Sequence, residues 1–114
     1  MITVYHNARC KKSREGLELV KNSGKEYQVR EYLKEPLSER ELKEILEKLG
    51  FYPMQLIRTN EKIWKEEYKN KDLNDRELIT VMVKNPKLIE RPIVEVKDTA
   101  VVGRPSSKIE DLLQ

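Results

Sequence analysis

The chain has 114 residues, which is enough to bury one hydrophobic core and lies in the size range of a single domain. Hydrophobic residues make up 38% and charged residues another 38%, which excludes a membrane-embedded chain and a disordered one. The net charge of +3 is too small to indicate a nucleic-acid groove by itself, and we expect no nucleic-acid partner. We therefore expect one globular domain over residues 1–114.

Cysteine usage and the N-terminus indicate the compartment. A single cysteine cannot form an internal disulfide. The N-terminus lacks the basic-then-apolar pattern of a secretory signal, and no apolar run approaches the roughly 20 residues of a spanning helix. We expect a cytoplasmic protein with no membrane partner.

The first third of the sequence predicts a β-α-β unit. Residues 2–6 are β-branched or aromatic and precede a polar turn, which is typical of a buried strand. From Lys11 the sequence favours a helix, which the Ser-Gly pair at 23–24 would stop. A second strand is predicted over residues 27–33. Cys10 is therefore expected in the turn that opens the first helix.

The middle of the sequence predicts helices. A capping box at Ser38 precedes an apolar stripe that ends at Gly50. The same kind of signal at Asn74 starts another helix, which runs to the Asn-Pro pair at 85–86. Between these two helices, residues 54–71 mix apolar and charged side chains and predict short helices.

The last third predicts a hairpin and a closing helix. Two short apolar runs, residues 92–96 and 100–103, flank three residues of turn chemistry. Ser107 and Glu110 are then expected to cap a last helix. This order of elements predicts an α/β, thioredoxin-like (glutaredoxin-like) fold, with a mixed sheet, flanking helices and an inserted helical segment.

Cys10 is the residue best suited to chemistry. A lone cysteine is often only a small buried hydrophobe. Here the helix N-terminus and the neighbouring cations both favour the reactive thiolate. The cations are Arg9, Lys11, Lys12 and Arg14. The sequence therefore predicts an activated, nucleophilic thiol at Cys10.

Ser13 stands where redox motifs of the Cys-x-x-Cys type have their second cysteine. Without a resolving cysteine in the chain, an adduct on Cys10 needs an outside thiol, which releases it through a mixed disulfide. Two roles are open for Ser13: a hydrogen bond to the thiolate, or an ordinary place in the first helical turn.

Three arginines, Arg58, Arg91 and Arg104, lie beside structure-breaking residues, and each alone is typical of a solvated surface. Arg91 and Arg104 differ because they bracket the predicted hairpin and would meet at one end of the sheet. If that end also holds Cys10, they form an oxyanion clamp, since guanidinium groups bind tetrahedral oxyanions through paired, charge-assisted hydrogen bonds.

Five separated motifs carry a family resemblance over nearly the whole chain. They are YHNARCKKSR at 5–14, YLKEP at 32–36, LIRTN at 56–60, LIERPIV at 88–94 and GRPS at 103–106. Together they resemble the ArsC-type arsenate reductases, a glutaredoxin-coupled family with a thioredoxin fold.

The resemblance implies an arsenate reductase of the glutathione/glutaredoxin type. Cys10 would attack arsenate or a similar oxyanion, while Arg58, Arg91 and Arg104 would bind the oxyanion and the arsenylated intermediate. Glutathione, as co-substrate, and then the partner protein glutaredoxin would complete the reduction to arsenite. No bound cofactor and no metal are implied.

Two further residues take roles from the resemblance. His6 is implied to help keep the thiol ionised, against the alternative of a strand-end histidine bonded to the backbone. Pro92 is implied to follow a cis peptide bond, although only about 5% of bonds before proline are cis.

Two other functions stay open. Spx-type transcription regulators share the fold and the loop but bind RNA polymerase, commonly through a Cys-x-x-Cys switch that Ser13 removes here. A glutathione-dependent thiol oxidoreductase would keep the thiol but act on disulfides, without arsenate activity. The three arginines favour the oxyanion enzyme over the regulator.

Overall fold

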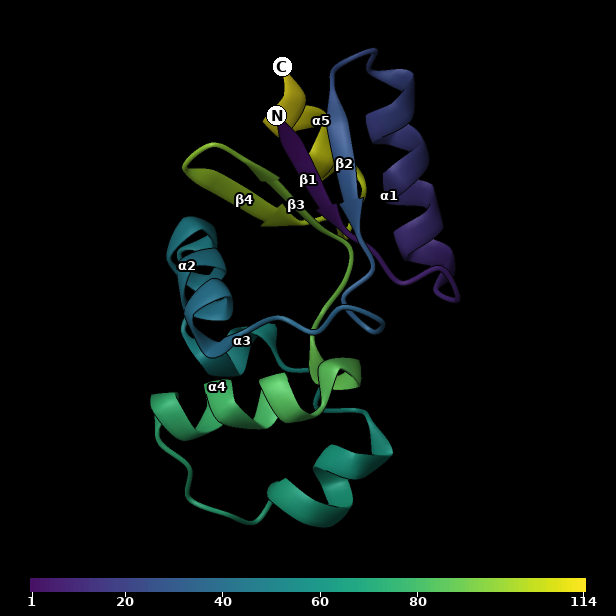
Figure 1. Ribbon diagram of the computed structural model, residues 1–114. Coiled ribbons are helices and arrows are strands. Elements are labelled where there is room, and N and C mark those ends of the chain that lie inside the picture. Colours follow the sequence, from purple (N-terminus) through teal and green to yellow (C-terminus); the bar gives the residue numbers. More distant parts are fainter. The chain divides into compact units, whose positions relative to one another are not determined.

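The computed structural model describes residues 1–114, which form two compact units. Unit 1 comprises Met1–Glu35 and Arg91–Gln114, and unit 2 comprises Pro36–Glu90 (Figure 1). The expectation of one domain stays a prediction. None of the helices has the length and apolar character needed to cross a membrane.

Unit 1 is built on a mixed sheet of four strands in the order β2-β1-β3-β4. β1 pairs in parallel with β2 and antiparallel with β3, and β3 and β4 form an antiparallel hairpin. The parallel pair joined by a helix confirms the predicted β-α-β unit, and the hairpin is also confirmed. The strands are β1 (Ile2–Tyr5), β2 (Tyr27–Arg30), β3 (Ile93–Val96) and β4 (Thr99–Val102).

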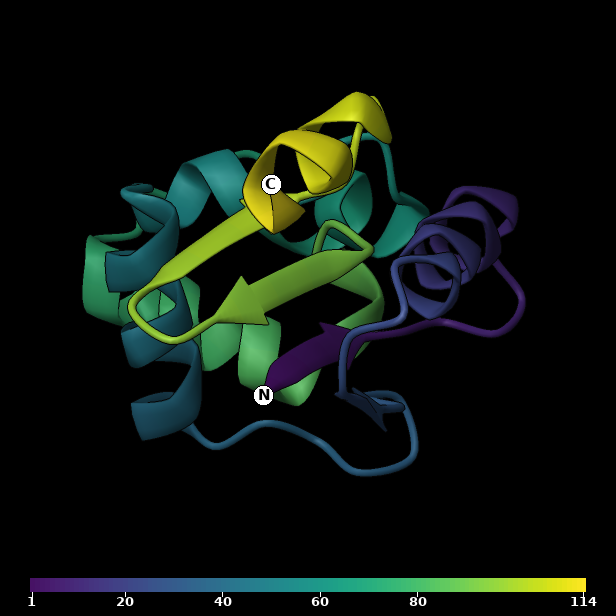
Figure 2. The same cartoon turned by 90° about the horizontal axis from the view of Figure 1, so that it is seen from above.

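Two helices, α1 (Lys11–Asn22) and α5 (Ser107–Leu113), contact each other and cover one face of this sheet (Figures 1 and 2). Side chains alternate along a strand, so every second residue points to the helices. The core of unit 1 forms between these layers from apolar side chains that are at most 3% exposed. They are Ile2, Val4, Val20, Val94 and Ile109.

The second strand is shorter than the sequence predicts. β2 ends at Arg30, whereas residues 27–33 were expected to be extended. The carbonyl of Glu31 accepts hydrogen bonds from the backbone N–H groups of Lys34 (3.0 Å) and Glu35 (2.9 Å). These bonds fold the chain into a turn, so the aromatic and apolar residues after Arg30 do not extend the strand.

The predicted cap of the last helix is wrong. Ser107 is the first helical residue, and Ser106 precedes it without a side-chain cap. The N–H groups of Lys108 and Ile109 donate instead to the carbonyls of Pro105 (3.1 Å) and Ser106 (2.9 Å). Backbone acceptors therefore satisfy the first turn, a common alternative at helix ends.

Unit 2 is helical, and α4 contacts both α2 and α3. It contains α2 (Glu39–Leu49), α3 (Pro53–Leu56), the π-helical turn η1 (Trp64–Tyr68), α4 (Asp75–Lys84) and the 3₁₀ turn η2 (Pro86–Leu88). The short helices expected between residues 54 and 71 are thus present as α3 and η1.

The capping signals of unit 2 act as the sequence predicts. The Ser38 hydroxyl accepts from the Glu41 N–H (3.1 Å) while the Glu41 carboxylate accepts from the Ser38 N–H (3.0 Å). Asn74 and Glu77 repeat this reciprocal pair at the start of α4. Each box satisfies backbone N–H groups that a helix start leaves unpaired. At the other end of α2, Gly50 has φ 69°, a left-handed geometry that glycine adopts without strain.

Candidate active site

The loop between β1 and α1 holds Cys10 at the start of the helix. Cys10 is the N-cap residue, with extended backbone (φ −97°, ψ 122°), and its side chain is partly exposed. The buried residue Asn7 organises the loop: its carbonyl accepts from the Cys10 N–H and its side-chain oxygen from the Arg9 N–H, both at 3.0 Å. The sequence reasoning did not assign this role to Asn7, although a polar residue directly after a buried strand was a usable signal.

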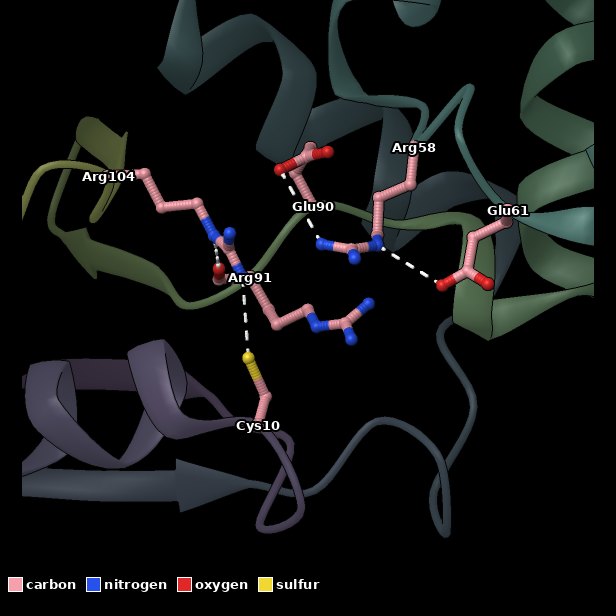
Figure 3. A network of polar contacts seen from close by, with 6 residues as sticks. All are labelled: Cys10, Arg58, Glu61, Glu90, Arg91 and Arg104. Carbon is pink, nitrogen blue, oxygen red and sulfur yellow. Dashed lines mark hydrogen bonds and ion pairs between the residues drawn. The ribbon is translucent and has the colours of Figure 1, made fainter.

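Arg104 lies against the sulfur. Its Nη2 donates to Cys10 Sγ at 3.3 Å, and its Nε donates to the backbone carbonyl of Arg91 at 2.7 Å (Figure 3). The two bonds fix the guanidinium plane beside the thiol, because Nε and Nη2 are donors of one rigid fork. Arg91 and Arg104, which bracket the β3–β4 hairpin, therefore do lie together at the Cys10 end of the sheet.

Several groups lower the pKa of the Cys10 thiol below its ordinary value. Burial acts in the opposite direction and raises it, but this is outweighed by the backbone N–H groups of Ser13 and Lys12 and by the hydrogen bond and charge of Arg91. Arg104 lies 3.3 Å from the sulfur, and Arg91 is the guanidinium that most lowers the pKa of the thiol, through a hydrogen bond and through its charge. Both effects favour the thiolate, which is the nucleophilic form.

The cations of the loop contribute differently from what the sequence suggests. The side chains of Arg9 and Lys11 are not among the main groups that lower the thiol pKa. Arg14 donates to the Ala8 carbonyl at 2.9 Å, and Lys12 pairs with Glu15 at 3.8 Å. These long side chains reach solvent and neighbouring backbone, so proximity in sequence does not bring their charge to the sulfur.

His6 and Ser13 form a buried pair behind the loop. His6 Nδ1 lies 2.7 Å from Ser13 Oγ, which also accepts from the Asn7 N–H at 2.9 Å. Ser13 thus engages the thiol through its backbone N–H, while its hydroxyl is used by His6 and Asn7. The pKa of His6 is lowered, chiefly by burial and also by the positive charge of Arg14, against an opposing contribution from Glu31. A direct role of His6 in ionising Cys10 stays a prediction.

Pro92 lies close to Gly16 of α1. The Arg91–Pro92 peptide bond is cis, as the family resemblance implies, and so is Arg104–Pro105, which the sequence reasoning did not anticipate. Gly16 of α1 approaches Pro92 so closely that a Cβ on Gly16 would lie 2.7 Å from the proline Cγ. A residue with any side chain would push the first helix away from the proline.

In unit 2, Arg58 is held between two carboxylates (Figure 3). Its Nε donates to Glu61 Oε1 at 3.3 Å, and its Nη1 lies 4.0 Å from Glu90 Oε2. The backbone brings these residues together, because Arg58 N donates to Leu88 O (2.7 Å) beside the Ile57–Ile89 bridge. Glu61 and Glu90 were not predicted as site residues, although glutamates directly before Arg91 and three residues after Arg58 are visible in the sequence.

No group of three or more His, Cys, Asp or Glu side chains in the chain is arranged to hold a metal ion. The chemical groups at the site are one thiol with a lowered pKa and guanidinium groups. In such an arrangement the sulfur can act as a nucleophile, and the guanidinium groups can bind an anion beside it.

Sequence comparison identifies the family. A sequence model of the ArsC family matches residues 5–112. The chain belongs to the ArsC family. It is 38% identical to a Haemophilus influenzae protein named arsenate reductase, with 98% of each chain covered. It is 40% identical to the Escherichia coli protein "Uncharacterized protein YfgD", over 98% of this chain and 96% of that one.

Structural comparison agrees with the family. The solved structure of an arsenate reductase from Vibrio cholerae has a TM-score of 0.91 and 38% identity, and the match covers 96% of this chain and 95% of that one. The α/β, thioredoxin-like fold with a four-stranded mixed sheet is thereby confirmed for this ArsC-family chain. The assignments of individual site residues stay predictions.

Proposed function

We propose that this ArsC-family protein reduces arsenate to arsenite through a covalent adduct on Cys10, in the cytoplasm, with glutathione and glutaredoxin as the outside thiols. One observation carries the proposal: Arg104 Nη2 lies 3.3 Å from Cys10 Sγ. The lowered pKa of the thiol supports the same reading. A cation fixed beside the sulfur favours the thiolate and stands where an attacked oxyanion would place its negative oxygens.

The proposed chemistry balances with two outside thiols. The Cys10 thiolate attacks the arsenic of arsenate, an S–As bond forms, and one arsenate oxygen leaves as water after protonation. Two external thiols then supply two electrons that reduce As(V) to As(III), and they leave as one disulfide. The S–As bond then breaks, with water supplying the oxygen that replaces sulfur on arsenic, so arsenite is released and Cys10 returns to its thiolate. The chain has no second cysteine, which supports an external resolving thiol.

The arginines are assigned to the oxyanion. Arg104 and Arg91 belong to unit 1 with Cys10, and the fork of Arg104 is already oriented by the Arg91 carbonyl. Arg58 belongs to unit 2, and its assignment rests on the family resemblance. Each guanidinium would neutralise charge that grows on the arsenate oxygens as sulfur attacks.

A coupled assay tests the proposal directly. Purified protein is supplied with arsenate, glutathione, glutaredoxin, glutathione reductase and NADPH, and arsenate-dependent NADPH oxidation is measured. We expect turnover that stops when arsenate or glutaredoxin is left out. Absence of turnover together with a tight complex with RNA polymerase would favour the transcription regulator instead.

A second candidate is a glutathione-dependent thiol oxidoreductase that acts on mixed disulfides. The observation that favours it is the environment of Arg58, whose positive charge is offset by Glu61 and Glu90. A disulfide substrate carries no tetrahedral anion and does not require Arg58. The same assay with a glutathione mixed disulfide in place of arsenate separates the two functions, since this candidate predicts turnover of the disulfide alone.

A further inference from the structure

Arg58 and Glu61 lie side by side, and each has one polar group without a hydrogen-bond partner in the chain: a donor on Arg58 and an acceptor on Glu61. Arg58 contacts the carboxylates through Nε and Nη1, so its Nη2 has no partner. Glu61 uses Oε1 toward Arg58, so its Oε2 has none. The side chains are 14% and 29% exposed, and neither Arg58 Nη2 nor Glu61 Oε2 is a buried atom without a partner, so both atoms are reachable from solvent.

The pair is held in place from both sides. Arg58 N donates to Leu88 O (2.7 Å) and Glu90 N donates to Leu56 O (2.9 Å), so the backbone on each side of the guanidinium is fixed. The Glu61 N–H donates to the Arg58 carbonyl (3.2 Å), which keeps the glutamate in the turn that follows. With Glu90 at Nη1, the guanidinium has carboxylates at two of its three nitrogens. Its positive charge is thus offset, and it would attract any anion less than an isolated arginine does.

A carboxylate next to an anion site favours anions that carry a proton over anions that carry none. An ionised carboxylate accepts hydrogen bonds and cannot donate one, so an oxygen that faces it must carry a proton. Arsenate and phosphate carry at least one proton near neutral pH, and sulfate carries none. A sulfate oxygen would meet the carboxylate with an unfavourable contact between two negative groups.

Building on the proposed function, we propose that Arg58 and Glu61 select protonated tetrahedral oxyanions over fully ionised ones. Arg58 donates to an ionised oxygen of arsenate, and Glu61 accepts from a protonated oxygen of the same anion. Glu61 is then a specificity-determining residue, and sulfate is the anion that the site rejects.

The test uses the anions themselves and does not depend on turnover. Sodium phosphate and sodium sulfate are titrated into the full chain at neutral pH and constant ionic strength, and NMR shifts of the arginine Nε–H groups report binding. The Arg58 signal is identified from its loss in Arg58→Lys. We expect phosphate to bind the wild-type chain about tenfold more tightly than sulfate, since an unmade hydrogen bond to a charged group costs about that much affinity.

Glu61→Gln should remove the discrimination, because the amide of glutamine can donate to a sulfate oxygen as well as accept from a protonated one. We expect the ratio of the two dissociation constants to fall to about two. The matched control is Glu66→Gln, which removes the same charge from an exposed pair with Lys62 and should keep the wild-type ratio.

Two results would overturn the selection by Glu61: equal affinity of the wild-type chain for both anions, or a ratio that Glu61→Gln leaves unchanged. A response of the Arg104 signal without any response of Arg58 would overturn it while the oxyanion enzyme survives. If no arginine signal responds to either anion, the proposed arsenate chemistry fails as well.

Discussion

Arg104 and Arg58 are held by different kinds of acceptor. Arg104 donates to a neutral main-chain carbonyl, that of Arg91, and faces the thiol of Cys10. Arg58 donates to the carboxylate of Glu61 and lies near that of Glu90. A carbonyl orients a guanidinium without cancelling its charge, whereas carboxylates orient it and offset the charge.

The difference separates two tasks. A cation in contact with the sulfur, as Arg104 is, can stabilise a thiolate and the developing charge of an attacked oxyanion. A cation between carboxylates contributes orientation and hydrogen-bond specificity more than attraction. Substitutions at the two positions should therefore have effects of different size, and the sulfur itself should be more sensitive than either.

The largest expected effect is the loss of the nucleophile. Cys10→Ser should abolish arsenate turnover in the coupled assay, because a serine hydroxyl is not ionised near neutral pH and is too weak a nucleophile to form the bond to arsenic. The fold should be unaffected, which circular dichroism and thermal unfolding can check. Turnover that persists in Cys10→Ser would remove Cys10 from the mechanism.

Arginine-to-lysine substitutions compare how much the guanidiniums of Arg104 and Arg58 contribute to arsenate turnover. Arg104→Lys keeps a positive charge, but one ammonium group cannot replace a fork that spans the Arg91 carbonyl and Cys10 Sγ. We expect a loss of about 1.5–3 kcal/mol in transition-state stabilisation, or roughly 10- to 100-fold in kcat/KM for arsenate. Arg58→Lys should lose less than about tenfold, because its charge is already offset.

The matched control for both substitutions is Arg40→Lys, at an exposed arginine of α2 that pairs with Glu44 and should not change kcat/KM. Reduction of a glutathione mixed disulfide should suffer much less than arsenate reduction in Arg104→Lys. Equal losses at Arg58 and Arg104 would contradict the distinction between the two environments.

A smaller effect concerns the ionisation of the thiol. The rate of Cys10 alkylation by iodoacetamide should follow a pH midpoint below the ordinary value of about 8.5, since the pKa of Cys10 is lowered. Arg91→Gln should raise this midpoint, because Arg91 contributes both a hydrogen bond and a charge to the thiolate. Arg9→Gln is the control from the loop and should leave the midpoint in place. A larger rise of the alkylation midpoint in Arg9→Gln than in Arg91→Gln would show that the loop cations cause the lowered pKa of Cys10.

The smallest expected effect is at His6. The chain has one histidine, so its ring proton can be followed by NMR without ambiguity. Because burial lowers the pKa of His6, its titration midpoint in the folded chain should lie below 6.5. The urea-unfolded chain provides the reference, with a midpoint near the ordinary value of about 6.5.

The same titration has a consequence for stability. Below about pH 6.5 the unfolded chain binds a proton at His6 that the folded chain resists, so the free energy of unfolding should decrease as the pH falls through this window. The contribution is fully present above that pH. A folded-state midpoint at or above 6.5 would contradict the lowering of the His6 pKa by burial.

The sequence by itself determined the local parts of this protein. The boxes at Ser38 and Asn74 specify two helix starts because their donors and acceptors lie three residues apart. The β-branched and aromatic residues of the first strand and the polar turn before Lys11 place Cys10 at a helix N-terminus. The ordered motifs indicated the family, which the comparisons confirm.

Only the tertiary structure decided which charged side chains lie next to the Cys10 thiol and next to Arg58. Arg104 reaches the sulfur from 94 residues away in sequence, while Arg9 and Lys11 beside Cys10 do not contribute strongly to its ionisation. The carboxylates on Arg58 depend on the bridge between Ile57 and Ile89, which no local pattern specifies. Capping and strand signals act over a few residues, whereas the ionisation of a thiol depends on distances in space. Those distances are set by the pairing of β1 with β3 and by the hairpin that follows.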